Sequence, residues 1–195
     1  MSVPNPYQFP ENLPRPSDDG GAAHLVGMDL PDVVLKSSDG KNVRLTELNK
    51  GGGIVFYFYP QTGVVGKDPA TGWDDIPGAP GCTVQSLGFR DLFAEFQRKN
   101  VQIVGISTQN SDEQAEFAER NKIPFPLVSD GELALTKALC LPTFTAGGAN
   151  TFLKRLAVFV EKGKIKKVFY PVFPPDENAE TVLTWLRNRN RQQPA

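Results

Sequence analysis

Two kinds of hydrophobic pattern alternate along the middle of this chain. Residues 54–59 form a continuous β-branched and aromatic run with no polar alternation, which is typical of a strand buried on both faces. Residues 101–107 predict a second buried strand. Between these runs, hydrophobic residues recur at helical spacing over 83–99, and 111–121 begins with residues that favour a helix start. The order predicts a strand–helix–strand–helix unit.

Shorter patterns predict the elements on either side of this unit. Turn-forming residues separate pairs of strand-like runs, and the C-terminal segment repeats hydrophobic residues at helical spacing. The expected elements are a hairpin (33–35 with 43–45), one helical turn (46–48), an extended piece (125–128), a short helix (129–139), a second hairpin (156–160 with 165–170) and a terminal amphipathic helix (178–191).

The order of these elements indicates the fold class. Buried strands linked by helices favour an α/β fold with a central mixed β-sheet flanked by helices. Residues 1–23 are rich in proline and are expected to form an irregular N-terminal leader, and residues 24–195 a single domain. Residues 61–81 form a loop of a length that is usually functional or mobile in a compact domain.

Composition excludes several classes of protein. The 195 residues are 39% hydrophobic and 22% charged, with a net charge of −1, as in ordinary globular domains. These values disfavour collagen-like, disordered, membrane-spanning and disulfide-scaffold proteins. The near-neutral charge offers no basic surface, so we expect neither a nucleic-acid nor a membrane partner.

Cysteine and histidine are scarce. The chain has Cys82, Cys140 and one histidine, His24, which are too few for a structural zinc site. We therefore expect no metal or other cofactor, and chemistry that runs without histidine. The N-terminal residues lack the apolar core of a signal peptide. Two cysteines in a chain of this length also do not match the pattern of a disulfide-rich secreted protein. A reducing, cytoplasmic location is the expectation.

Cys82 is the leading candidate for chemistry. It follows a buried strand across the long loop and opens the predicted helix. At a helix start, unpaired backbone N–H groups and the positive end of the helix dipole stabilise a thiolate, which is the nucleophilic form of cysteine. On position alone, the alternative is a small apolar residue that packs the start of a helix.

The residues around Cys82 carry a family resemblance. The segments are Phe56-Tyr-Phe-Tyr-Pro60, Ala79-Pro-Gly-Cys-Thr-Val-Gln85, Gly88-Phe-Arg-Asp91, Val104-Gly-Ile-Ser107, Phe125-Pro-Leu-Val-Ser-Asp130, and Arg155 with the strand that follows it. Together they resemble the peroxiredoxins, most closely the peroxiredoxin Q or bacterioferritin-comigratory-protein branch. The resemblance covers roughly residues 28–187.

The resemblance implies a thioredoxin-like fold and a thiol-dependent peroxidase that reduces hydrogen peroxide and organic hydroperoxides. Cys82 would be the peroxidatic cysteine and would become a sulfenic acid. Arg155 would favour the thiolate and donate hydrogen bonds to the peroxide oxygens. The segment of Pro80 and Gly81 would hold the peroxide, and Gln85 would join the polar network. Without the resemblance, Arg155 would be interpreted as a solvated edge residue and Gln85 as a surface helix residue.

Two departures from the family pattern lie before Cys82. The family usually carries threonine three residues before this cysteine, and here that residue is Ala79, so a hydroxyl donor is missing. The lengthened loop 61–78 also separates Pro60 from Cys82, so Pro60 is not assured of shielding the sulfur, and Pro77 or Pro80 is an alternative. Within this loop, Trp73 and Ile76 either cover the pocket or simply pack the loop.

A third departure concerns the resolving cysteine. Many members of this branch carry one five residues after the peroxidatic cysteine, where this chain has Leu87. Only Cys140 remains, either as a buried core residue, as an unconventional resolving thiol or as a site of intermolecular pairing. We therefore expect a one-cysteine cycle in which an external thiol (thioredoxin, glutaredoxin or glutathione) reduces the sulfenic acid.

Other functions stay open at this point. A two-cysteine enzyme that resolves through Cys140 is one alternative, and a non-catalytic or redox-sensing thioredoxin-fold module is another. Thiol–disulfide exchange is disfavoured because Gln85 stands where a Cys-x-x-Cys motif would have its second cysteine. The aromatic and proline-rich run 169–175 could cover the core, line the site or form a dimer face, so both monomer and homodimer are retained.

Overall fold

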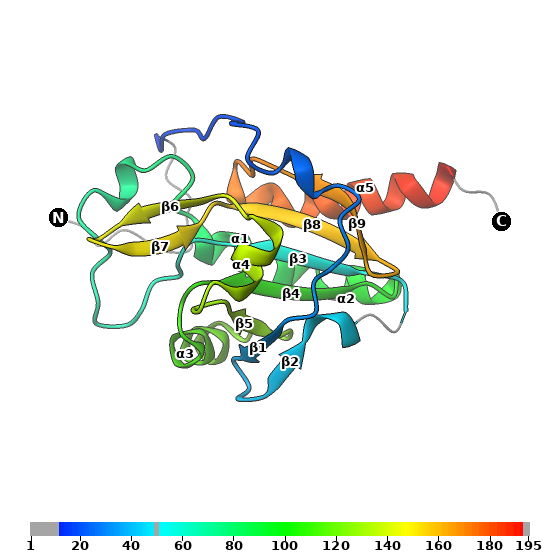
Figure 1. Ribbon diagram of the computed structural model, residues 1–195, viewed down its shortest axis with the longest axis horizontal. Helices are drawn as coiled ribbons and strands as arrows, with labels where there is room; N and C mark the ends of the chain where they lie inside the picture. Colours follow the sequence, from blue (N-terminus) through cyan, green and yellow to red (C-terminus); the bar gives the residue numbers. More distant parts are fainter. Residues whose placement is uncertain (1–11, 49–50, 193–195) are drawn as a thin grey trace.

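The computed structural model describes residues 12–48 and 51–192. Within these residues, the central sheet contains seven strands. The strands are β1 (Val34–Ser37), β2 (Asn42–Arg44), β3 (Ile54–Phe58), β4 (Gln102–Ser107), β5 (Leu127–Ser129), β8 (Leu156–Glu161) and β9 (Lys164–Phe169). Their order is β2-β1-β5-β4-β3-β8-β9 (Figure 1). β3, β4 and β5 are parallel, and the outer pairs are antiparallel, so the predicted mixed sheet is confirmed.

Helices cover both faces of this sheet. They are α1 (Cys82–Asp91), α2 (Phe93–Arg98), α3 (Ser111–Asn121), α4 (Ala134–Leu139) and α5 (Asn178–Gln192). One core packs α4 and the segment around Leu25 against the sheet, and the other packs α1, α2, α3 and α5 against the opposite face. Figure 1 shows α4 in front of the sheet and α5 behind it. This is the expected α/β, thioredoxin-like arrangement.

Strand β3 joins the two cores. Phe56 and Phe58 point into one core, and Tyr57 and Tyr59 point into the other, because successive strand residues face opposite sides of a sheet. All four side chains are at most 1% exposed. Burial of each such aromatic side chain contributes about 1.5–3 kcal/mol. The lack of polar alternation at 54–59 therefore predicted the position of this central strand correctly.

The prediction of one helix over residues 83–99 was wrong in one respect, because this segment forms two helices, α1 and α2. Leu92 separates α1 from α2 and has a ψ of 6° rather than a helical value. The side chains of Phe89 and Phe96 still meet in the same core, with ring centroids 5.9 Å apart. A change at one residue leaves the hydrophobic spacing intact, so the periodicity could not reveal the break.

The short helix expected from residue 129 begins later than predicted. Asp130 lies in a turn, and Leu133 adopts a left-handed backbone (φ +57°) before α4 starts. The Asp130 carboxylate accepts hydrogen bonds from the backbone N–H groups of Leu135 (2.9 Å) and Thr136 (2.8 Å). Asp130 thus caps the helix from outside it, a tertiary arrangement that propensity alone does not encode.

A second, two-stranded sheet was not predicted. β6 (Thr143–Ala146) and β7 (Asn150–Leu153) form a hairpin that packs against the long loop 61–81 (Figure 1). The Trp73 ring lies 5.0 Å from the ring of Phe152 and 6.0 Å from that of Phe144. Trp73 therefore packs the loop onto this hairpin, which decides between the two roles that the sequence left open for it.

Residues 12–22 of the predicted leader are irregular, and residues 1–11 lie outside the described part of the chain. The leader is attached to the domain through Asp19, whose carboxylate pairs with Lys154 (2.5 Å) and accepts a hydrogen bond from the Tyr170 hydroxyl (2.6 Å). The hydrogen bond from Lys154, and then that from Tyr170, holds the pKa of Asp19 well below its usual range. The domain boundary at residue 23 stays a prediction.

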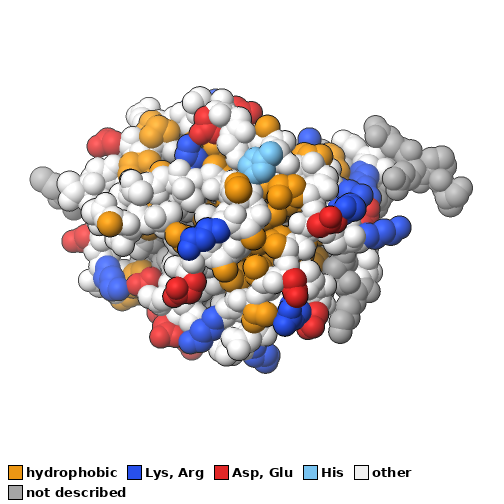
Figure 2. Space-filling model, viewed as in Figure 1, with side chains coloured by type: hydrophobic (Ala, Val, Ile, Leu, Met, Phe, Trp, Pro, Cys, Tyr) orange, Lys and Arg blue, Asp and Glu red, His pale blue; other side chains and the backbone are white. Residues whose placement is uncertain are grey.

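The single histidine has a structural contact. His24 Nε2 lies 2.8 Å from the carbonyl oxygen of Leu139, the last residue of α4. Figure 2 shows the histidine in pale blue at the edge of a group of hydrophobic side chains on the face that α4 occupies in Figure 1. The contact holds the N-terminal segment against α4.

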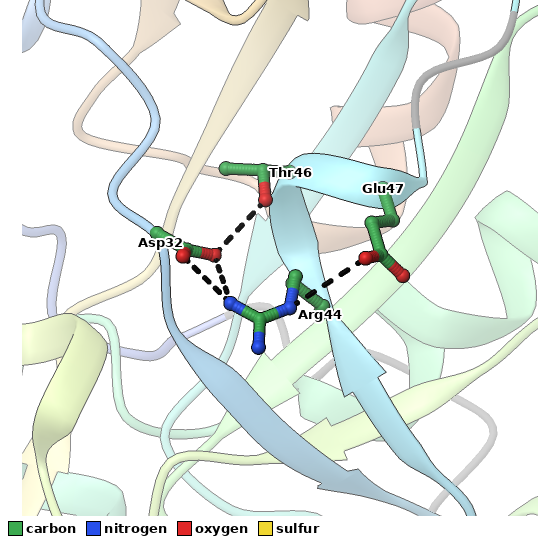
Figure 3. Close-up of polar contacts among 4 residues, drawn as sticks. All are labelled: Asp32, Arg44, Thr46 and Glu47. Carbon is green, nitrogen blue, oxygen red and sulfur yellow. Dashed lines mark hydrogen bonds and ion pairs between the residues drawn. The ribbon is translucent and has the colours of Figure 1, made fainter.

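Polar contacts join the two sides of the β1–β2 hairpin at the end away from its turn. Arg44 on β2 donates to both carboxylate oxygens of Asp32 (2.6 Å each), and the Thr46 hydroxyl donates to the same carboxylate (3.1 Å) (Figure 3). Glu47 lies 3.6 Å from Arg44 Nε. The Arg44 hydrogen bond lowers the pKa of Asp32. This cluster joins the segment before β1 to β2 and is exposed, so we interpret it as structural.

Candidate active site

Cys82 is the first residue of α1 and is 3% exposed. Gly81 precedes it with a φ of +97°, a left-handed value that glycine adopts without steric cost. The Cys82 sulfur lies 3.2 Å from Arg155 Nη2, 3.4 Å from the backbone nitrogen of Gln61 and 3.5 Å from the carbonyl oxygen of Ala79. The sulfur therefore has two N–H donors directed at it, an arrangement suited to a negatively charged thiolate.

Arg155 reaches the sulfur from the residue before β8 and is 3% exposed. Its Nη2 group also lies within hydrogen-bond distance of the carbonyl oxygens of Gly78 (3.2 Å), Ala79 (3.0 Å) and Pro80 (2.9 Å). Among the described residues no carboxylate pairs with Arg155. Its positive charge is therefore held by backbone dipoles and the sulfur, so it is free to balance a thiolate. The solvated-edge interpretation of Arg155 is wrong.

Gln85 lies one turn along α1 and is fully buried, so the surface-residue interpretation is also wrong. Its side-chain oxygen accepts a hydrogen bond from Arg155 Nη1, and its Nε2 donates to Asn178 Oδ1 at 3.0 Å. Asn178 begins α5 and is 3% exposed. Sequence reasoning missed Asn178, because no local pattern connects residues 93 positions apart.

We expect Gln85→Met to destabilise the fold and disturb the site together. Methionine has a similar volume but leaves Arg155 Nη1 and Asn178 Oδ1 without their buried partner, which costs about 1–3 kcal/mol per group. Urea denaturation measures the free energy of unfolding. Gln97→Met on α2, where the glutamine is exposed, is the matched control. An unfolding free energy equal to that of Gln97→Met would mean that the Gln85 amide contributes no net stability.

The loop before Cys82 contributes backbone oxygens to the site. Pro80 and Gly78 offer carbonyls to Arg155, and Ala79 is fully buried against Trp73 and Phe152. The Ala79 side chain supplies no hydroxyl, as the sequence indicated. Pro77 is exposed and lines a cavity with Ile76.

Pro60 remains close to the sulfur despite the lengthened loop. It is buried, and Gln61, the next residue, directs its backbone N–H at Cys82. The added residues therefore extend outward from a fixed strand end. Sequence reasoning treated Gln61 only as the start of a loop and missed its contact with the sulfur.

Two cavities adjoin these residues. One of about 520 Å³ has a largely polar lining that includes Gln61, Thr108, Gln109, Asn150 and Phe152. Another of about 290 Å³ is lined by residues of the leader and of the long loop, together with Lys154, Arg155 and Tyr170. Each cavity is therefore lined by one of the two residues that donate to the Cys82 sulfur, Gln61 in the first and Arg155 in the second.

Cys140 is exposed, so the buried core residue, one of the three roles that the sequence left open for it, is excluded. It ends α4 with a left-handed backbone (φ +49°), while its neighbours Leu139 and Leu141 are buried. This turn directs the Cys140 side chain outward between two inward-facing residues. Cys82 and Cys140 are both free thiols, and neither contacts the other in the structure.

Tyrosine hydroxyls lie beneath the site in the buried layer. Tyr57 donates a hydrogen bond to Ser86 Oγ (3.1 Å), and its ring stacks on Phe89 at 4.5 Å. Burial raises the pKa of Tyr57, and also that of Tyr59, well above the ordinary value. Both hydroxyls therefore stay protonated at neutral pH and serve as packing and hydrogen-bonding groups.

The described part of the chain shows neither a metal-binding cluster nor a membrane span. No group of three or more His, Cys, Asp or Glu side chains is placed to hold a metal ion within residues 12–48 and 51–192. No helix of these two ranges is long and apolar enough to cross a membrane.

The fold and site together define a class of protein: a thioredoxin-like domain with a buried, arginine-paired cysteine at a helix start. Comparison with known proteins agrees with this class. The family model described as Redoxin matches residues 25–183. The chain belongs to the redoxin family, and its relatives place it among the peroxiredoxins of the peroxiredoxin Q and bacterioferritin-comigratory-protein type.

Individual relatives support this placement. Chloroplastic peroxiredoxin Q of Sedum lineare is 30% identical over 165 residues, which cover 83% of this chain and 77% of the relative. Chloroplastic peroxiredoxin Q of Gentiana triflora is 29% identical over 161 residues, or 81% of this chain. The chain spans only 64% of the length of that relative.

Solved structures show the same fold. Peroxidoxin BcpB from Mycobacterium tuberculosis has a TM-score of 0.67 and 29% identity, and the match covers 84% of this chain and 96% of that protein. A cysteine-to-serine mutant of Xanthomonas campestris peroxiredoxin Q has a TM-score of 0.66 and 26% identity, with coverage of 85% of this chain and 99% of that protein.

Proposed function

We propose that this chain is a thiol-dependent peroxidase that reduces hydrogen peroxide and organic hydroperoxides through Cys82. The observation that carries the proposal is the pairing of the buried Cys82 sulfur with Arg155 at 3.2 Å, at a helix start and without a competing carboxylate in the described part of the chain. Membership of the redoxin family supports it. So does the alkyl peroxide reduction activity attributed to the 25% identical Xanthomonas campestris bacterioferritin comigratory protein.

The first step is oxidation of the sulfur. The Cys82 thiolate attacks the terminal oxygen of the hydroperoxide, an S–O bond forms, and the O–O bond breaks. The leaving alkoxide, or hydroxide from hydrogen peroxide, takes a proton and departs as alcohol or water. Cys82 is left as a sulfenic acid. Arg155 and the backbone of Gly81 and Cys82 hold the peroxide oxygens, and Arg155 stabilises the charge that develops on them. Gln85 orients Arg155 through its hydrogen bond to Nη1.

The second step returns the cysteine to the thiol. An external thiol condenses with the sulfenic acid, which releases water and forms a mixed disulfide, and a second thiol reduces that disulfide. The reductant would be thioredoxin, glutaredoxin or glutathione, and the enzyme a monomer or homodimer in the cytoplasm. A one-cysteine cycle is favoured because Cys140 is exposed on another element and does not contact Cys82.

Intact mass after one equivalent of hydrogen peroxide, with peptide mapping, tests this cycle. We expect a gain of about 16 Da on Cys82, the mass of one oxygen in a sulfenic acid, with no disulfide. Cys140→Ser should keep multiple-turnover peroxide consumption with an external thiol. A loss of about 2 Da that links Cys82 to Cys140 would establish a two-cysteine cycle. No change at Cys82 within seconds would refute the peroxidase proposal.

A further inference from the structure

The end of β3 supplies a second donor to the Cys82 sulfur. The backbone nitrogen of Gln61 lies 3.4 Å from Sγ, and its N–H is directed at the sulfur. The chain lacks a side-chain hydroxyl in the loop residue three positions before Cys82, because Ala79 occupies it. We propose that the Gln61 N–H is a catalytic donor that stabilises the Cys82 thiolate, and that Gln109 is the positioning residue that holds this N–H in place.

Gln109 is bonded to the residue next to Gln61 at three points. Its side-chain oxygen accepts from the backbone N–H of Thr62 (2.8 Å) and from the Thr62 hydroxyl (3.0 Å). Its side-chain nitrogen donates to the backbone carbonyl of Thr62 (3.1 Å). The amide thus pairs with both backbone groups of Thr62 as a neighbouring strand would. Thr62 is 1% exposed and Gln109 is 5% exposed, so water does not compete for these bonds.

Gln109 is itself fixed to the central sheet. Its backbone N–H donates to Ser107 Oγ at 3.3 Å, and its carbonyl accepts from Ser129 Oγ at 2.6 Å. Ser107 ends β4 and Ser129 ends β5. The position of the Gln61–Thr62 backbone is therefore set by the carboxyl ends of two parallel strands.

This attachment is needed because the chain leaves the sheet directly afterwards. Gly63 and residues 65–69 are exposed, and Val65 is 68% exposed. Residues 61 and 62 would otherwise be the first part of a long surface loop. Gln109 holds them in place, so the Gln61 N–H stays directed at the sulfur although the exposed loop begins two residues later.

The physical effect is on the charge of the sulfur. A thiolate accepts hydrogen bonds only, and a bond to a charged group contributes about 1.5–3 kcal/mol. Loss of the Gln61 N–H should therefore reduce the thiolate population at a given pH. We expect the pH midpoint of Cys82 alkylation to rise by about one unit, which is a tenfold lower thiolate population below the midpoint.

The experiment follows the alkylation of Cys82 by iodoacetamide across pH, with peptide mass spectrometry to separate it from Cys140. Gln61→Pro removes the N–H, and Gln109→Ala removes the amide that positions it. Val65→Pro is the proline control, because Val65 is exposed at the second position of the turn that joins Val64 to Lys67. Asn121→Leu removes another buried amide, whose nitrogen donates to the Phe117 carbonyl at 2.9 Å and which bonds neither Thr62 nor Ser107.

The proposal predicts a raised midpoint in Gln61→Pro and Gln109→Ala and an unchanged midpoint in the two controls. An unchanged midpoint in folded Gln61→Pro would overturn it. If Gln61→Pro does not fold, Gln109→Ala decides: a raised midpoint supports the inference, and a wild-type midpoint refutes it. A similar rise in Asn121→Leu would also refute it, since any lost buried amide would then have the effect.

This inference rests on the proposed function only in calling the Gln61 N–H a donor for peroxide reduction. Alkylation reports the thiolate without a peroxide or a reductant, so the two can fail separately. If the wild-type protein consumes no peroxide but the variants show the predicted alkylation midpoints, the peroxidase proposal is refuted and the present inference stands. If the protein consumes peroxide but Gln61→Pro leaves the alkylation midpoint unchanged, the role of the Gln61 donor is refuted and the peroxidase proposal stands.

Discussion

Cys82→Ser is expected to abolish the multiple-turnover consumption of hydrogen peroxide while the fold remains intact. The serine hydroxyl is not ionised at neutral pH and is a far weaker nucleophile than a thiolate, so no oxidised intermediate can form. The substitution exchanges one small buried side chain for another, and the contacts of Gln85 and Asn178 do not involve the sulfur. We expect consumption to fall to the rate of buffer with reductant alone, measured by following residual peroxide.

Cys140→Ser is the matched control for this variant, because it removes the only other cysteine. Circular dichroism and thermal unfolding of both variants should resemble those of the wild type. Sustained peroxide turnover by Cys82→Ser would assign the nucleophile to another residue and overturn the proposed chemistry. Loss of turnover in both variants would instead indicate a cycle that needs Cys140.

Arg155→Met should slow the oxidation of Cys82 by about 10²–10³-fold, the usual cost of removing one donor that stabilises developing oxygen charge. Methionine keeps much of the buried volume but removes both the positive charge and the donors. The sulfur then loses its 3.2 Å contact, and the carbonyls of residues 78–80 lose their shared partner. The second-order rate constant for oxidation, measured by stopped flow at several peroxide concentrations, tests this expectation.

A second substitution separates charge from geometry. Arg155→Lys keeps the charge but cannot contact Gln85, the loop carbonyls and the sulfur together, so we expect an intermediate rate. Arg44→Met is the control, because Arg44 lies on β2, at the opposite edge of the sheet from β8 and β9, where it pairs with Asp32 (Figures 1 and 3). A rate constant for Arg155→Met equal to that of Arg44→Met would exclude Arg155 from the reaction.

Several features of the fold could be predicted from local patterns. The aromatic run at 54–59 specifies a doubly buried strand because both sets of alternating side chains are apolar. The start of the α3 helix was also predicted, and Asn110 caps it by accepting a hydrogen bond from the Glu113 N–H at 2.8 Å. The hairpin β6–β7 was missed because it packs against hydrophobic residues of a separate loop, Trp73 among them.

The site was predicted in part. Cys82 could be identified from its position at a helix start, and Arg155 from the resemblance to a family. Burial of Gln85 and its bond to Asn178 depend on how α1 packs against α5. Cys140 shows the opposite case, since apolar neighbours suggested a buried thiol and a left-handed turn exposes it.

The sequence by itself determined the elements whose cause is local: the buried strands, the helices with periodic apolar residues, and a cysteine at a helix start. Apart from Arg155, which the family resemblance indicated, tertiary structure alone decided which polar groups lie around the sulfur. Gln61, Arg155 and the Gln109 amide come from separate segments, and their approach depends on strand order and on backbone groups. Backbone N–H and C=O groups are the same in every non-proline residue, so a sequence cannot mark which of them lie at the site.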